Sequence, residues 1–236
     1  MGFFEIIKNG GLLTVKFGGS AEFLKWLAIA SIGVMALGYV LGSLNGASII
    51  SKYMYNDDIR KYGSKNAGAT NMMRTYGFKG GMLTSLIDIL KTVIAVGAGY
   101  FLCSVLLPYL AGLFCLIGHA FPLFFGFKGG KGVIVTATTV AVTSWPTFLV
   151  LVILWGLILA FTKYVSVASM VSALMYPFIL SRIARMFGQK PDFGAVVAFV
   201  MACMVIFLHR SNIGRLKNGT ENKIGKKKDG DKKDGN

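Results

Sequence analysis

The chain has 236 residues, of which 54% are hydrophobic and only 15% are charged. Soluble domains are usually less apolar and carry more charge, so this composition excludes an ordinary soluble protein. The formal net charge of +15 could indicate a nucleic-acid-binding protein, but the most basic stretch, KIGKKKDGDKKDGN at the end of the chain, lacks the aromatic residues of such a surface. We therefore expect an integral membrane protein with membrane lipids, and no nucleic acid, as partners.

Residues 1–25 precede the first long apolar run. They lack the apolar core and the small-residue cleavage site of a removed signal peptide. We expect an N-terminal extension whose role the sequence does not assign, followed by a first span that acts as its own signal.

Seven apolar runs follow in chain order. A bilayer needs about 20 apolar residues per helix, and several of the runs are shorter than that. They predict an all-α, polytopic membrane protein with about seven transmembrane helices in one domain, residues 26–209, and a cytoplasmic tail, residues 210–236, that is disordered at its Lys-rich end. The runs lie at about 26–50, 80–106, 108–126, 132–144, 146–162, 164–181 and 193–209.

The basic residues predict the orientation, because lysine and arginine concentrate in cytoplasmic loops. With the N-terminus outside and the C-terminus inside, most of the 25 lysines and arginines lie on the inner side. The loop at 182–192 is a mild exception. This orientation also puts all three polar, glycine-rich stretches of the chain at the cytoplasmic interface.

The first of these stretches spans residues 42–77 and centres on GSKNAGATN. Glycines allow a backbone to approach a ligand closely, and successive N–H groups can form a nest for phosphate oxygens. Arg74 follows and could grip a phosphate in a bidentate fork. The alternative is a loop that needs turn residues and a helix cap.

Asp88 is the only acidic residue within the predicted spans, and Lys91 follows about one turn later. A charge inside a span needs a partner or a purpose. We expect an internal Asp88–Lys91 pair, with a structural role or one in lining a pathway.

The second stretch, GHAFPLFFGFKGGKG, begins with Gly118 and His119. A nucleotide-binding P-loop requires Ser or Thr after its Gly-Lys pair, whereas Gly132 follows Lys131 here, so we exclude nucleotide hydrolysis. Two lysines on a flexible backbone remain, which suit an anion site or simple anchoring at the membrane surface. A packed role for His119 is as consistent with the sequence as a functional one.

The third stretch, LHRSNIGRLKNGTENK, places His209, Asn212 and Arg215 on one face if the last helix continues through them. Metal-dependent phosphate chemistry asks for carboxylates that hold Mg²⁺, and these stretches contain few. We therefore expect no metal and no cofactor.

Together, GSKNAGATN, GHAFPLFFGFKGGKG and HRSNIGRLKNGTE closely resemble the motifs of the bacterial acyl-phosphate:glycerol-3-phosphate acyltransferase family, PlsY, over about residues 35–223. The resemblance implies a seven-helix enzyme of phospholipid synthesis in the bacterial cell (inner) membrane, with its active site facing the cytoplasm. Such enzymes transfer a fatty acyl group from acyl phosphate to the 1-position of glycerol 3-phosphate and release lysophosphatidic acid. The soluble enzyme that makes acyl phosphate is then a candidate partner.

Matched residue by residue, the resemblance implies catalytic and substrate-binding positions. The catalytic ones are His209, Asn212 and Lys131. The substrate-binding ones are Ser64, Asn66, Gly68, Thr70, Asn71, Arg74, Lys128, Gly129, Gly130, Gly132 and Arg215.

The chain departs from the family pattern at several positions. Asn45 stands where proline is usual, and Lys65 where glycine is usual. Ser211 replaces a glutamate close to His209, which weakens any scheme in which that carboxylate assists the histidine.

The mechanism that we expect is direct acyl transfer without an acyl-enzyme, because no Ser–His–acid triad is visible. The base remains open between His209 and a substrate phosphate oxygen. A transporter or channel for a phosphorylated anion is the alternative from another class, although its polar groups would have to line both sides of the membrane. A lipid phosphotransferase is a second enzymatic alternative, which predicts dependence on Mg²⁺.

Overall fold

The computed structural model describes residues 2–188 and 193–224, and within them every regular element is a helix. The predicted disorder of the last residues, 225–236, concerns positions outside the described residues. The α-helices are α1 (Phe3–Lys8), α2 (Leu12–Phe17), α3 (Glu22–Ser43), α4 (Gly46–Tyr55), α5 (Ala69–Leu102), α6 (Leu107–Ala120), α7 (Val133–Thr143), α8 (Trp145–Thr162), α9 (Val165–Met186), α10 (Phe193–Leu208) and α11 (Arg210–Lys217), with 3₁₀ turns η1 (Ile59–Lys61) and η2 (Leu123–Phe125).

Each of the seven predicted apolar runs contains a helix, namely α3 and α5 to α10. Five stretches of the described chain are long and apolar enough to cross a membrane, or six if the bent pair α10 and α11 counts as one span. The difference from about seven spans arises mainly at α7, which has 11 residues and is too short to cross the hydrocarbon core alone. The protein is an all-α, multi-pass membrane protein with five to six candidate spans.

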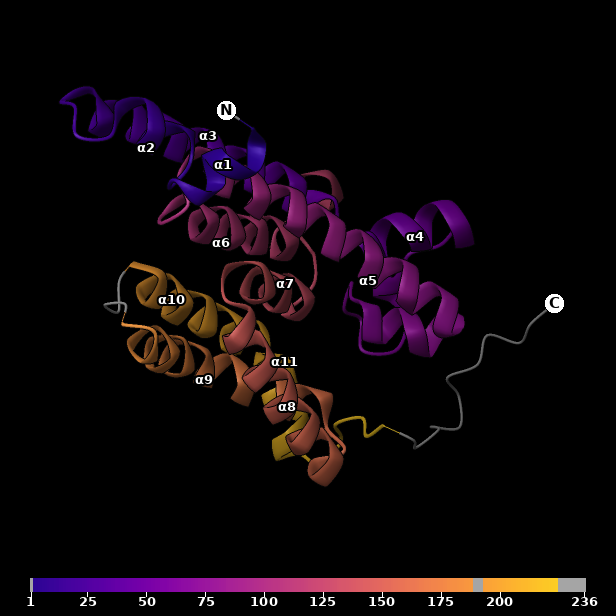
Figure 1. Ribbon diagram of the computed structural model, residues 1–236. Helices are drawn as coiled ribbons and strands as arrows, with labels where there is room; N and C mark the ends of the chain where they lie inside the picture. The colour runs from indigo at the N-terminus through magenta and orange to yellow at the C-terminus, as the bar shows by residue number, and fades with distance from the viewer. Residues whose placement is uncertain (1, 189–192, 225–236) are drawn as a thin grey trace.

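Two groups of helices meet at α7 (Figure 1). Helices α3, α5 and α6 pack on one another, and α9 packs against both α8 and α10. Helix α7 contacts α5 and α6 from the first group and α8 from the second. The loop before α7 is therefore held at the junction of the two groups.

The contact between α3 and α6 depends on small residues. A Cβ atom on Gly38 would lie 2.7 Å from the Ala111 carbonyl oxygen, and one on Gly42 would collide with the carbonyl of Cys115. Glycines four residues apart let two membrane helices approach closely enough for backbone contact. This approach packs α3 and α6 directly against each other.

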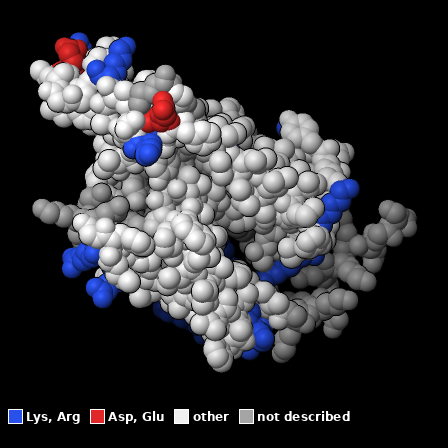
Figure 2. All heavy atoms as spheres, viewed as in Figure 1, with Lys and Arg blue, Asp and Glu red and all other residues white. Residues whose placement is uncertain are grey.

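The outer surface of the bundle is apolar. Figure 2 shows one face as an almost unbroken area of uncharged residues, with lysines, arginines and acidic residues at its borders. Large side chains such as Ile153, Leu157 and Phe199 are more than half exposed on the spans. Such a surface fits contact with lipid tails.

The helix is interrupted between α3 and α4, where the sequence predicts one continuous apolar run. Asn45 caps the new helix, because its side-chain oxygen accepts a hydrogen bond of 2.9 Å from the N–H of Ser48. Its amide also donates to the carbonyl of Ala67 at 3.3 Å, which ties the break to the first polar loop. The asparagine that replaces the usual proline thus has a defined structural role.

The Asp88–Lys91 pair of α5 supports the same break. The two side chains are almost fully buried, with 2.7 Å between Nζ and Oδ1. Lys91 donates to the carbonyls of Gly42 and Leu44, each at 3.0 Å, and Asp88 accepts from the N–H of Gly46 at 3.3 Å. The pair therefore satisfies backbone groups that the break leaves without helical partners, as buried polar groups require. The structural pair predicted from the sequence is confirmed.

Candidate active site

A polar cavity of about 390 Å³ lies where the three polar stretches meet. Its walls combine residues 64–74, residues 131–134 and residues 209–224, which are far apart in the sequence. Eleven of the predicted site residues line it: Ser64, Asn66, Gly68, Thr70, Asn71, Arg74, Lys131, Gly132, His209, Asn212 and Arg215.

Asn71 organises the first wall of the cavity. Its side-chain oxygen accepts from the N–H of Ser64 at 3.0 Å, and its amide donates to carbonyls of Tyr62 and Asn66 at 3.0 and 3.1 Å. A side chain with this many internal bonds holds the loop in shape and has little capacity left for a ligand. The geometry assigns Asn71 to the support of the loop that presents Ser64.

Lys65 occupies a strained position in the same loop. Its φ of 57° lies in the left-handed region, which disfavours residues with a Cβ atom. This geometry explains why glycine is the usual residue in the family pattern. The lysine adds a positive charge on the exposed side of the loop.

Helix α5 starts at the cavity wall. Gly68 precedes the first turn, and Thr70 and Arg74 follow on the cavity side one turn apart. The N-terminus of a helix carries partial positive charge and unpaired N–H groups, which favour a bound anion. The position of these residues at the start of α5 is thus consistent with the anion site predicted for the first stretch.

The second stretch contributes fewer contacts than the sequence predicts. Lys128 is exposed, and the N–H groups of Gly129 and Gly130 donate to Ala120 and His119 carbonyls at 3.0 and 3.1 Å. None of these three residues is among those that line the cavity in the described part of the chain. The substrate-binding role implied for Gly129 and Gly130 stays a prediction; in the structure their N–H groups close the turn onto the end of α6.

Gly132 and Lys131 do reach the cavity. Gly132 has a φ of 71°, and a Cβ atom there would collide with the side chain of Leu116. Only glycine fits this turn without strain. The turn delivers the partly buried Lys131 side chain to the cavity at the start of α7.

The third wall is a hydrogen-bonded network, which we call the cavity network: Lys131, Ser166, Asn212, Arg215 and Glu221. Lys131 donates to the side-chain oxygen of Asn212, and the amide of Asn212 donates to Glu221 at 2.6 Å. Ser166 also donates to Glu221, at 2.8 Å, and Arg215 pairs with its other oxygen at 2.7 Å. Glu221 thereby fixes the orientation of two predicted site residues.

The electrostatics of this network favour an anion. The pKa of Lys131 is lowered to about 8, first by burial and also by the nearby charges of Arg215 and Arg74, against the opposing effect of Glu221. Burial acts to raise the pKa of Glu221, but its bonds from Asn212, Ser166 and Arg215 outweigh this and hold that pKa below its usual value. Three cationic side chains thus face one carboxylate, and a bound anion would relieve their mutual repulsion.

His209 lies at a bend of 51° between α10 and α11, so the single continued helix that the sequence suggested is not formed. The imidazole is buried, and its Nδ1 atom lies 2.7 Å from the carbonyl oxygen of Val205. A carbonyl only accepts, so Nδ1 carries the proton and Nε2 of the neutral ring keeps a free lone pair. The bend still brings His209, Asn212 and Arg215 to one cavity.

Comparison with known proteins identifies the family. The family model described as glycerol-3-phosphate acyltransferase matches residues 32–219. A glycerol-3-phosphate acyltransferase of Finegoldia magna is 39% identical over 207 residues, which cover 86% of this chain and 100% of that protein. Glycerol-3-phosphate acyltransferase 2 of Bacillus anthracis is 42% identical over 195 residues, 82% of this chain and 99% of that one. The chain belongs to the glycerol-3-phosphate acyltransferase family.

Solved structures agree with this assignment. The crystal structure of PlsY (YgiH), an integral membrane glycerol 3-phosphate acyltransferase in its glycerol 3-phosphate form, has a TM-score of 0.72 and 32% identity, and the match covers 83% of this chain and 96% of that chain. The lysophosphatidic acid form has a TM-score of 0.71 and 31% identity, with 83% and 95% covered. The protein is therefore a glycerol-3-phosphate acyltransferase of phospholipid synthesis, and the matched region contains the predicted site residues.

Sequence reasoning missed several residues that line the acyltransferase cavity, among them Asp88, His119, Ser166 and Trp155. Ser166 and Trp155 lie inside apolar runs, where nothing in the pattern marks them. The sequence points to Asp88 only as part of an ion pair, and it leaves open whether His119 is packed or functional. Their burial next to the cavity is the signal that only the structure provides.

Proposed function

We propose that the protein transfers a fatty acyl group from acyl phosphate to the 1-position of glycerol 3-phosphate, directly and without a metal ion, to form lysophosphatidic acid. The main support for the proposal is that a cationic cavity and an apolar pocket adjoin each other and share lining residues. A reaction between two phosphate compounds, one of which carries a fatty chain, needs both.

The cationic half suits the phosphate groups. Lys131, Arg74 and Arg215 line one cavity with the N-terminal turn of α5. In the proposal, Arg74, Lys131 and Ser64 hold glycerol 3-phosphate, while Thr70, Asn212 and neighbouring N–H groups hold the acyl phosphate. Donors already fixed before the reaction can stabilise the oxyanion that develops on the acyl carbonyl.

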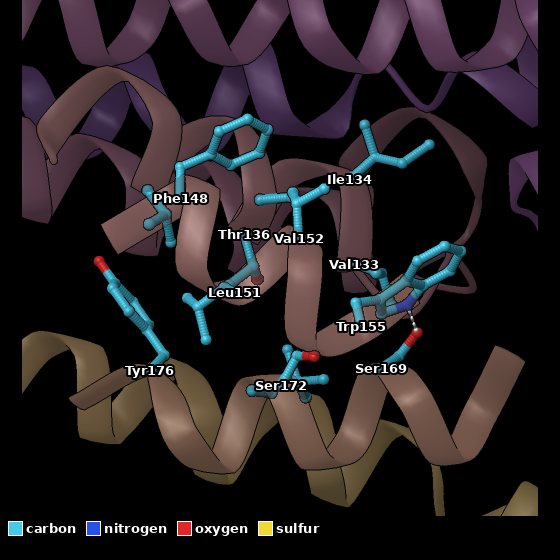
Figure 3. A pocket seen from close by; sticks show the side chains of 14 residues that line it. Val133, Ile134, Thr136, Phe148, Leu151, Val152, Trp155, Ser169, Ser172 and Tyr176 are labelled. Carbon is cyan, nitrogen blue, oxygen red and sulfur yellow. Dashed lines mark hydrogen bonds between the residues drawn. The ribbon is translucent and has the colours of Figure 1, made fainter. Parts of the chain in front are cut away.

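The apolar half suits the fatty chain. A pocket of about 240 Å³ lies between α7, α8 and α9 and is lined by side chains such as Phe148, Leu151 and Tyr176 (Figure 3). Val133, Ile134, Trp155 and Ser169 line both the pocket and the polar cavity. In Figure 3 these four residues lie on the same side of the pocket, and the indole N–H of Trp155 donates to Ser169 at 3.2 Å. An acyl group that enters at Trp155 would have its carbonyl beside the cationic site and its chain among apolar side chains.

The donor set supports a reaction without a metal. Among the described residues, no group of three or more His, Cys, Asp or Glu side chains lies close enough together to hold a metal ion. The cavity contains Glu221 and Asp88 as its acidic residues, and both are bonded to cationic side chains. Positive side chains then neutralise the phosphates in the proposed reaction.

His209 is the proposed base. Its Nε2 lone pair accepts the proton of the acceptor hydroxyl while that oxygen attacks the acyl carbonyl; the carbon–oxygen bond to phosphate breaks, and inorganic phosphate leaves. A substrate phosphate oxygen is the other candidate acceptor for this proton. We expect His209→Gln and His209→Ala to lower kcat by about 10² or more and to abolish the loss of activity at acidic pH. An unchanged pH profile would assign the proton to the substrate phosphate.

The proposal includes an active site that faces the cytoplasm, with the N-terminus outside and the C-terminus inside. The basic residues of segments 51–79, 127–131 and 210–224 support this orientation through the positive-inside rule. The soluble enzyme that makes acyl phosphate would then meet the site on the same side, as a candidate partner.

One assay tests the proposed function. Purified protein in detergent receives acyl phosphate and labelled glycerol 3-phosphate, with and without a chelator of divalent cations. We expect labelled lysophosphatidic acid at equal rates in both samples. A transporter would form no product, and a metal-dependent phosphotransferase would stop when the chelator is added.

A further inference from the structure

A second histidine lies at the cavity, next to the buried ion pair. His119 is 3% exposed, and its Nδ1 atom lies 3.0 Å from Nζ of Lys91 and 3.4 Å from Oδ1 of Asp88. We call these three residues, Asp88, Lys91 and His119, the buried cluster. His119 and Asp88 also line the polar cavity.

The contact with Lys91 determines which nitrogen of His119 carries the proton. An ammonium group can only donate hydrogen bonds, so a protonated Nδ1 at 3.0 Å would place two donors face to face. The Lys91 contact at 3.0 Å is shorter than the 3.4 Å contact of Nδ1 with Oδ1 of Asp88, so it favours Nδ1 as the acceptor and places the proton of the neutral ring on Nε2. The 2.7 Å ion pair with Asp88 keeps the lysine in its charged form.

The Nε2–H group lies on the cavity side of the ring. Within residues 2–188 and 193–224, Nε2 makes no hydrogen bond of its own, although the ring is almost fully buried. A Cβ atom on Gly130 would collide with it, so the absence of a side chain at Gly130 keeps this nitrogen uncovered. An N–H group at a cavity that has no protein acceptor is available to donate to a bound ligand.

We propose that His119 is a substrate-binding residue whose Nε2–H donates a hydrogen bond to a phosphate oxygen of a bound substrate. This proposal rests on the proposed function. The Asp88–Lys91 pair acts through the histidine as a positioning pair, because it fixes the tautomer. The phosphate belongs to glycerol 3-phosphate or to acyl phosphate, and the kinetics below distinguish the two.

A matched pair of variants tests the binding role in the full chain. The amide nitrogen of glutamine reaches close to the position of Nε2, whereas that of asparagine reaches only as far as Nδ1. We expect His119→Asn to raise KM for one of the two phosphate substrates roughly 10- to 100-fold, the range for a lost hydrogen bond to a charged group, and His119→Gln to raise it about fivefold or less. The substrate whose KM rises is the one that His119 binds. A purely structural role of Nδ1 predicts the reverse order, and that order, or two wild-type-like variants, would overturn the proposal.

Nitrogen NMR provides a test that does not depend on variants or on activity. The chain has two histidines, which the structure gives opposite tautomers: Nε2–H in His119 and Nδ1–H in His209. With ¹⁵N-labelled histidine in the detergent-solubilised protein, we expect one ring of each form and a shift of the His119 Nε2 signal on addition of glycerol 3-phosphate or a non-reactive acyl phosphate analogue. Two rings of the Nδ1–H form, or a His119 signal that neither ligand moves, would contradict the assignment. An active wild-type enzyme with either result would refute the role of His119 alone, whereas an inactive wild type would refute the proposed function.

Discussion

The buried cluster and the cavity network are both built from charged residues, but they differ in how their charges are balanced. In the buried cluster, one carboxylate, one ammonium and several backbone groups satisfy one another at 2.7–3.3 Å. In the cavity network, Glu221 is bonded to Asn212, Ser166 and Arg215, and the charges of Arg215 and Arg74 act on the nearby Lys131. The Asp88–Lys91 pair is balanced without a ligand, and the cavity network gains from an anion. Changes to the Asp88–Lys91 pair should therefore affect folding first, and changes in the cavity network should affect catalysis first.

Lys91→Met should have the largest effect, and on stability. It leaves Asp88 buried without its ion-pair partner, which typically costs about 3–5 kcal/mol, and it removes the donor to the carbonyls of Gly42 and Leu44. We expect a strong fall in the thermal unfolding midpoint in detergent. Lys79→Met, on an exposed lysine of the same helix, is the control and should leave the midpoint unchanged. Equal midpoints for both variants would show that the buried pair is not structural.

Lys131→Ala should mainly affect catalysis. It removes a cation and a donor from the cavity, and the loss of one such preorganised group costs about 10²–10³ in rate. We expect kcat/KM to fall by this factor while the unfolding midpoint changes little, and Arg74→Ala to behave in the same way.

Lys128→Ala sharpens this test, because the sequence predicts a binding role for Lys128 and the structure leaves it exposed outside the cavity wall. We expect its loss of kcat/KM to be at least tenfold smaller than that of Lys131→Ala. Equal losses for the two lysine variants would contradict the observed turn.

The pH dependence of substrate binding should reflect Lys131. Its pKa lies at about 8 in the folded protein, below its ordinary value, so the side chain loses its positive charge as pH rises through that value. KM for the phosphate substrate that it holds should therefore rise above pH 8, by up to about tenfold per pH unit. Arginine stays charged throughout this range, so in Lys131→Arg this rise should disappear, whatever the activity of the variant. A rise that persists in Lys131→Arg would assign the titration to another group.

Lys65→Gly should have the smallest effect. It relieves a left-handed residue next to the cavity, which is worth about 1 kcal/mol or less because glycine also gains freedom in the unfolded chain. We expect a slightly higher unfolding midpoint than in Lys65→Ala, which removes the same charge but keeps the strain. A lower midpoint for the glycine variant would show that the strain is compensated elsewhere in the loop.

The sequence predicts much of this architecture, because apolar runs, glycine-rich turns and basic loops are local signals. Apolar runs are enough to predict the helices, and the Asp88–Lys91 spacing predicts the ion pair, whereas the eleven cavity residues follow from the resemblance of three motifs to the acyltransferase family. The sequence does not predict the break at Asn45 or the bend at His209, since both depend on partners elsewhere in the fold, such as Ala67 for Asn45. The same holds for Gly129 and Gly130, where composition suggests free N–H groups and only the fold reveals that Ala120 and His119 use them.

The shortness of α7 has a consequence for how the two reactants arrive. From their shared end at Ser144, the 11 residues of α7 cover about 16 Å, whereas the 18 residues of α8 cover about 27 Å. From these lengths we expect Lys131, just before α7, to lie deeper in the membrane than the far end of α8. A water-soluble reactant then has to enter the site from the aqueous phase, whereas a molecule already dissolved in the bilayer can reach it by lateral diffusion.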